Sequence, residues 1–150
     1  LCAMTRDNAR TPMQWDDSPQ SGFTTGTPWL PVNPNHVRIN AADQVGRAGS
    51  TFEFFRRMIA LRRTLPVLVD GDFQLLEPDD PTLWWVRRTL RGRVLDAVGN
   101  MSSAPIACAL PEGHVVLTNQ ETPVSGVWER AVLAPWEVRW VLGSTRDDPA

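Results

Sequence analysis

A run of polar and charged residues near the start of the 150-residue sequence carries the side chains best suited to chemistry. It reads Arg6-Asp7-Asn8-Ala9-Arg10-Thr11-Pro12-Met13-Gln14-Trp15-Asp16. A planar guanidinium can bond a carboxylate or two adjacent hydroxyls in a fixed geometry, which suits recognition of a vicinal diol such as that of a sugar. Arg6 and Arg10 are therefore candidate substrate-binding residues.

The same two arginines could instead hold the loop together by pairing with Asp7, Asp16 or Asp17, and structural ion pairs are common. Adjacent carboxylates in loops are mostly turn formers, so we interpret these acids as turn residues. Nothing in their spacing fixes the separation of two carboxylates that glycoside chemistry requires. The residues alone leave both roles of the arginines open.

Tryptophans could add a surface on which a sugar ring stacks. Trp15 and Trp29 lie in loop sequence, where such residues more often anchor a loop to a core, and we favour that role for Trp29. The remaining five fall in or near strand-like sequence, where we expect a core or an interface: Trp84, Trp85, Trp128, Trp136 and Trp140.

Metal and cofactor chemistry has no sequence support. His36 and His114 are isolated and lack metal-ligand spacing, and there is no glycine-rich phosphate loop or nucleophile elbow. The sequence therefore predicts neither a metal nor a cofactor. Cys2 and Cys108 have no framework spacing, so we expect reduced thiols and a cytoplasmic protein.

Composition excludes further classes of function. The net charge is −2 and neither sign clusters, which argues against nucleic acid or an anionic membrane as a partner. No apolar run approaches the roughly 20 residues that span a bilayer. The chain enters the polar loop directly, so we expect a piece of a longer protein.

Three regions differ in their predicted structure. Residues 1–49, rich in glycine and proline, read as one irregular segment, which in a compact domain indicates function. Residues 50–65 read as a helix with a wide apolar face, which begins with a capping box between Ser50 and Glu53 and ends before Pro66. From residue 67 onward the pattern predicts six or seven short strands at the spacing of a sandwich or barrel.

Residues 6–17 and 21–35 together resemble the α-amylase-type glycoside hydrolases of the oligo-1,6-glucosidase, α-glucosidase and trehalose synthase group. The likeness continues through Gln44, the following helix and the strand start at residues 71–73. It is close over residues 4–76 and loose beyond them, and so long a run is highly specific.

The resemblance implies an α+β fragment: the last loop and helix of a (β/α)8 barrel, followed by an antiparallel β-sandwich. Residues 1–66 would be the C-terminal end of the catalytic barrel, with its eighth β-to-α loop, residues 67–143 the sandwich, and residues 144–150 a tail. In this family an arginine of that loop lines the subsite for the non-reducing glucose, which implies Arg10 or Arg6 here, and we favour Arg10. Loops at this face of a barrel are where such sites lie.

The family's catalytic carboxylates all lie upstream of this loop. Retaining hydrolysis needs a carboxylate nucleophile about 5–5.5 Å from a carboxylic acid, so this chain is expected to be inactive alone. We expect the C-terminal part of an α-glucosidase or oligo-1,6-glucosidase-like hydrolase, with an α-glucoside oligosaccharide as substrate and the missing N-terminal barrel as partner.

Three alternatives remain. One is a trehalose synthase fragment, and another is a catalytically inactive scaffold of the same fold. The third is a non-catalytic carbohydrate-binding β-sandwich module, which exposed tryptophans on one sheet face would favour and burial of Trp84, Trp85 and Trp140 would oppose.

Overall fold

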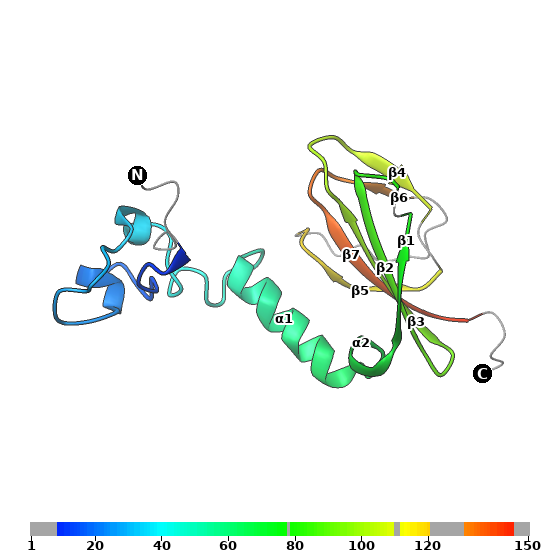
Figure 1. Ribbon diagram of the computed structural model, residues 1–150, viewed down its shortest axis with the longest axis horizontal. Coiled ribbons are helices and arrows are strands. Elements are labelled where there is room, and N and C mark those ends of the chain that lie inside the picture. Colours follow the sequence, from blue (N-terminus) through cyan, green and yellow to red (C-terminus); the bar gives the residue numbers. More distant parts are fainter. Residues whose placement is uncertain (1–8, 78, 110–111, 121–130, 146–150) are drawn as a thin grey trace. The chain divides into compact units, whose positions relative to one another are not determined.

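The computed structural model describes residues 9–77, 79–109, 112–120 and 131–145 (Figure 1). The chain divides into two compact units, Leu1–Glu53 and Phe54–Ala150. Within the described residues, no helix is both long and apolar enough to cross a lipid bilayer.

The described part of the first unit consists of turns and two short 3-10 helices, η3 (Pro19–Gly22) and η4 (Pro34–Val37). In η3, Gln20 and Ser21 adopt left-handed φ angles of 56° and 51°. Asn33 starts η4, because its side chain accepts a hydrogen bond from the backbone N–H of Asn35. The expectation of an irregular segment before the main helix is confirmed for these residues.

The main helix, α1 (Thr51–Thr64), confirms the prediction for residues 50–65. Ser50 Oγ accepts from the backbone N–H of Glu53 at 3.2 Å, which is half of the predicted capping box. The other half is wrong: the Glu53 carboxylate accepts from Gly46 N at 2.8 Å, and Ser50 N donates to Arg47 O. The turn before the helix folds back over its first residues, so Glu53 meets a different amide donor.

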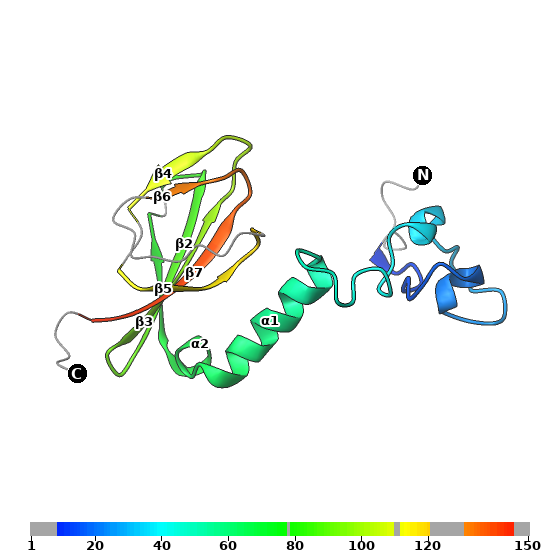
Figure 2. The same cartoon turned by 180° about the vertical axis from the view of Figure 1, so that it is seen from behind.

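The second unit contains α2 (Val67–Asp70) and two antiparallel sheets (Figures 1 and 2). The larger has the order β1-β2-β3-β7-β5, and the smaller pairs β4 with β6. The strands are β1 (Asp72–Leu76), β2 (Leu83–Leu90), β3 (Arg93–Asn100), β4 (Ile106–Cys108), β5 (His114–Thr118), β6 (Ala131–Leu133) and β7 (Val138–Ser144). The seven strands of the described residues agree with the six or seven short strands predicted from residue 67 onward.

Two apolar clusters stabilise the opposite faces of the larger sheet. Leu95 and Val98 are three residues apart on β3, so their side chains point to opposite faces. Val98 packs with Leu133 of β6, which joins the two sheets. Leu95 packs with Val67 and Leu68 of α2 on the other face, and Leu61 near the end of α1 packs against the same cluster.

Candidate functional site

A tight turn organises the polar loop that the sequence singles out. The Asp16 carboxylate accepts hydrogen bonds from the Ser18 backbone N–H at 2.9 Å and from the Ser18 hydroxyl. These bonds hold the pKa of Asp16 below its ordinary value, and the bond from the Ser18 hydroxyl has the largest effect. Ser21 O closes the turn by accepting hydrogen bonds from both Trp15 N and Asp16 N. Asp16 is a turn former, as expected.

Gln14 connects this turn to the segment that follows η4. Its side-chain amide donates to Asn35 Oδ1 at 2.9 Å and to the carbonyl of Ile39. The backbone continues the contact, since Ala41 N donates to Gln14 O and Ala42 N to Trp15 O, each at 2.9 Å. Two stretches about 25 residues apart in sequence are thereby fixed side by side.

Two further amides complete the network. Asn40, which is 3% exposed, donates to His36 O and Asp43 Oδ2 and accepts from Asp43 N. Gln44 accepts from Phe52 N through its side chain and from Ser50 Oγ through its carbonyl. The sequence analysis did not predict these roles of Gln14 and Asn40. The signal that could have indicated them is a side-chain amide in a loop with too few aliphatic residues to form a core, because the backbone groups of such a loop need polar partners.

Arg10 is the candidate sugar-binding residue within the described part of the chain. Its guanidinium lies over the Trp29 ring, 5.9 Å from the ring centroid, in a cation–π arrangement. Trp29 therefore orients Arg10 and offers at most its other face to a ligand. Arg6, the second candidate, and Asp7 lie outside the described residues.

The first unit exposes apolar side chains. Trp29 is 86% exposed, so its interpretation as an anchor is wrong for the described chain. The physical reason is that every buried aliphatic side chain of the described residues lies at Val67 or later, which leaves the loop no core to enter. Trp29, His36 and several prolines instead line an open hollow of about 640 Å³.

The tryptophans of the second unit divide between core and surface. Trp85 packs in the cluster between the sheets, and its indole N–H donates to Asp96, while Trp140 packs in the cluster beneath α2. Trp84 and Trp136 are 46% and 61% exposed. Trp128 lies outside the described residues. The packing of Trp85 and Trp140 counts against a module that binds carbohydrate on one sheet face, whereas the exposure of Trp84 counts in favour of it.

The remaining candidates are two histidines and two cysteines. His36 is bonded locally to Asn33 O at 3.1 Å and His114 is exposed, as predicted. Cys108 is a free thiol whose pKa is raised mainly by burial, and Cys2 lies outside the described residues. Across the described residues, no group of three or more His, Cys, Asp or Glu side chains could hold a metal ion.

Comparison with known proteins gives matches for this chain. The alpha-amylase family, described as the alpha amylase catalytic domain, matches residues 1–71. An oligo-1,6-glucosidase of Parageobacillus thermoglucosidasius is 38% identical over 141 residues, which is 89% of this chain and 25% of the relative. A trehalose-6-phosphate hydrolase of Escherichia coli is 38% identical over 102 residues, 68% of this chain and 18% of the relative.

Solved structures agree with the sequence matches. The isomaltulose synthase from Klebsiella sp. LX3 superposes with a TM-score of 0.86 at 36% identity, covering 93% of this chain and 26% of that one. A trehalulose synthase soaked with trehalulose gives a TM-score of 0.86 at 34% identity, covering 93% of this chain and 26% of that one. The chain thus spans between about a fifth and a quarter of the length of these relatives.

Proposed function

We propose, from the match of residues 1–71 to the alpha amylase catalytic domain, that the chain is the C-terminal part of an α-glucosidase-like glycoside hydrolase. The substrate class is a short glucan with an α-glucosidic bond. The chain contributes a sugar-binding loop from the end of a (β/α)8 barrel and a stabilising β-sandwich. Its partner is the rest of the barrel, which supplies the reacting carboxylates.

The observation that carries the proposal is the position of Arg10 inside the matched region. It lies in the loop that the family resemblance assigns to glucose binding, and its guanidinium is held over Trp29. A guanidinium oriented in this way can hold two adjacent sugar hydroxyls without first losing rotamer freedom. We propose Arg10 as the substrate-binding residue and keep Arg6 as the alternative.

The exposed apolar side chains support a partner surface. Phe52, Phe55 and Ile59 of α1 share one side of the helix and are 42%, 52% and 50% exposed. The first unit adds Trp15 and Ile39, which are 53% and 55% exposed. Together with the absence of a buried aliphatic side chain from the described part of that unit, this exposure fits a segment that packs against the remainder of a barrel.

A chimera tests the proposal directly. The C-terminal quarter of the oligo-1,6-glucosidase of Parageobacillus thermoglucosidasius is replaced by this chain, and kcat/KM is measured on isomaltose. We expect an active chimera, and no turnover of a chromogenic α-glucoside by the 150-residue chain alone. A chimera that is folded by circular dichroism but inactive, or a chain that is active alone, would contradict the proposal.

Variants of the chimera separate the two arginines. Losing a charge-assisted pair of hydrogen bonds costs roughly 1.5–3 kcal/mol, so Arg10→Gln should lower kcat/KM about 10–150-fold. Arg6→Gln is the matched variant, and a larger loss there would assign the sugar contact to Arg6. Trp29→Ala should have a smaller effect than Arg10→Gln, because it removes only the orientation of the guanidinium.

An isomerase is the second candidate function. The solved structures that superpose on this chain at a TM-score of 0.86 are isomaltulose and trehalulose synthases, and the sequence resemblance includes trehalose synthases. The discriminating experiment joins this chain to the N-terminal part of the isomaltulose synthase and supplies sucrose. Retained isomerisation favours the isomerase, and release of free glucose and fructose favours the hydrolase.

A further inference from the structure

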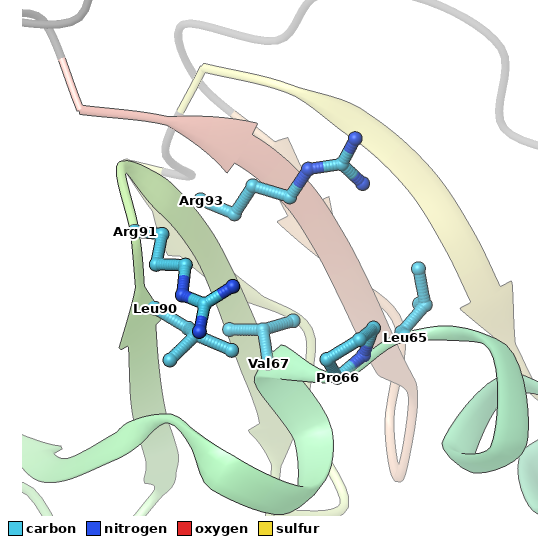
Figure 3. Close-up of a pocket in the computed structure, with 6 residues that line it drawn as sticks. All are labelled: Leu65, Pro66, Val67, Leu90, Arg91 and Arg93. Carbon is cyan, nitrogen blue, oxygen red and sulfur yellow. The ribbon is translucent and has the colours of Figure 1, made fainter.

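A pocket of about 330 Å³ opens in the second unit where the end of α1 and the start of α2 meet the β2–β3 hairpin (Figure 3). Its lining residues are Leu65, Pro66, Val67, Leu90, Arg91 and Arg93. Four of these six side chains are apolar, and the other two are cations. The volume lies at the lower end of the range found for small-molecule sites, which is about 300–1,000 Å³.

The apolar wall of the pocket is fixed by hydrogen bonds. The Arg88 guanidinium on β2 donates to the carbonyls of Val67, Val69 and Gly71, at 3.1, 3.2 and 2.7 Å. Arg62 donates to Leu68 O at 3.0 Å. The wall at residues 65–67 is therefore held in place before any ligand arrives, which lowers the entropic cost of binding.

The two arginines of the pocket differ from their neighbours in the sheet. Arg87 is paired with Asp96, and Arg88 donates hydrogen bonds to backbone carbonyls of α2. Arg91 and Arg93 have no side-chain hydrogen bond or ion pair with any residue that the structure describes. No acidic residue lines the pocket beside them. Two guanidinium groups in one pocket that has no acidic lining residue favour an anion.

The backbone of the hairpin adds an independent observation. Leu90 pairs with Arg93, so Arg91 and Gly92 form a two-residue turn with φ angles of 47° and 77°. Such turns favour Asn, Asp or Gly at the first central position. A bulky residue held at positive φ is an outlier, and such strain gathers at ligand-holding sites. Placing arginine there aims its side chain toward the pocket (Figure 3).

We propose that this pocket binds a small organic anion. A carboxylate or phosphate group would lie between the Arg91 and Arg93 guanidinium groups, and an apolar body would contact Leu65, Val67 and Leu90. This site consists of second-unit residues only and does not involve the sugar-binding loop. It can therefore be tested independently of the glucosidase proposal.

Titrations of the isotope-labelled 150-residue chain, followed by NMR, test the site with four probes. Benzoate and phenyl phosphate carry both an anionic and an apolar part, whereas benzyl alcohol lacks the charge and inorganic phosphate lacks the apolar body. We expect the first two to shift the amide signals of Val67 and of Leu90 to Arg93. The other two should bind at least about tenfold more weakly, because each loses one set of contacts.

Three variants locate the binding. Arg91→Asn, which suits the positive φ, and Arg93→Gln should each weaken benzoate binding about tenfold. Arg57→Gln removes an exposed arginine of α1 and should leave it unchanged. Circular dichroism checks that each variant keeps its sheet content.

Several outcomes would overturn the proposal. These are the absence of shifts from either aromatic anion at 20 mM, equal binding of the neutral and anionic probes, and an equal loss in Arg57→Gln. A preference for benzoate over phenyl phosphate, or the reverse, supports the site and identifies its anionic group.

Discussion

The Arg87–Asp96 pair gives a test of how the β unit is held together. Asp96 is 1% exposed and its carboxylate accepts from Arg87 Nε at 2.9 Å, from Arg87 Nη2 at 3.1 Å and from Trp85 Nε1 at 2.7 Å. The Arg87 side chain is 33% exposed. The two partners therefore differ in how well water could replace a lost contact.

The cost of each substitution follows from this asymmetry. Arg87→Met leaves a buried carboxylate with the Trp85 indole as its remaining side-chain donor among the described residues, and stranding a buried charge costs about 3–5 kcal/mol. Asp96→Asn keeps the shape of the side chain and one acceptor oxygen. The Arg87 guanidinium, which loses its counter-charge, is a third exposed and can be solvated by water. We therefore expect a loss of about 1–2 kcal/mol in the free energy of unfolding. The more exposed partner should thus be the costlier one to remove.

Urea unfolding followed by far-UV circular dichroism at pH 7 measures these free energies. The double variant should cost less than the sum of the single variants by about 1 kcal/mol or more, because the two residues are in contact. Arg57→Met on the exposed side of α1 is the control, expected within about 0.5 kcal/mol of the parent. A larger loss in Asp96→Asn than in Arg87→Met, or strict additivity, would refute the reasoning.

Three further predictions concern the loop and the free thiol. Gly22→Ala should loosen the turn, because its Cβ would lie 2.6 Å from Asp16 Oδ2 at a φ of 64°; amide hydrogen exchange at residues 15–21 should accelerate, and unchanged protection would contradict this. Ser18→Ala should raise the pKa of Asp16 toward its ordinary value, measured by carboxyl NMR. In the parent, this lowered pKa contributes folding stability that is present above pH 3.8 and is lost as the pH falls through the folded-state pKa. The variant should therefore lose less folding stability than the parent on acidification. An equal loss in the two proteins would contradict this. In a Cys2→Ser background, Cys108 should react with iodoacetamide more slowly at pH 8 than after unfolding in urea, because burial raises its pKa, and equal rates would contradict this.

Local signals were enough to predict most of the regular structure. Ser50, three residues before Glu53, and the apolar period that follows predicted α1 with ends accurate to one residue. The glycine of the Arg91–Gly92 turn is a local hairpin signal within the region predicted as strands, and the β2–β3 hairpin there pairs all eight residues of each strand. In each case the deciding interactions lie within about ten residues in sequence, where propensity and pattern act directly.

Features that depend on distant residues could not be read in this way. β6 is three residues long, too short for an alternating pattern, and it forms by pairing with β4. β7 lies between β3 and β5 in the sheet, an order that no local signal encodes. The pairing of Glu53 with Gly46 N belongs to the same class, because the turn that delivers Gly46 had to be known first.

The polar loop shows why its chemistry could be proposed before its geometry. Residue type identified Arg10 as a group able to bind a sugar. The position of its guanidinium, however, depends on Trp29, which lies nineteen residues later in the sequence. The network that holds this part of the chain consists of side-chain amides and backbone carbonyls, such as Gln14 to Ile39 O, and each bond is directional. Where no aliphatic core is available, directional bonds must fix the structure, and a single amide then matters as much as a core residue elsewhere. The shape of this loop therefore depends on the side-chain amides of Gln14 and Asn40.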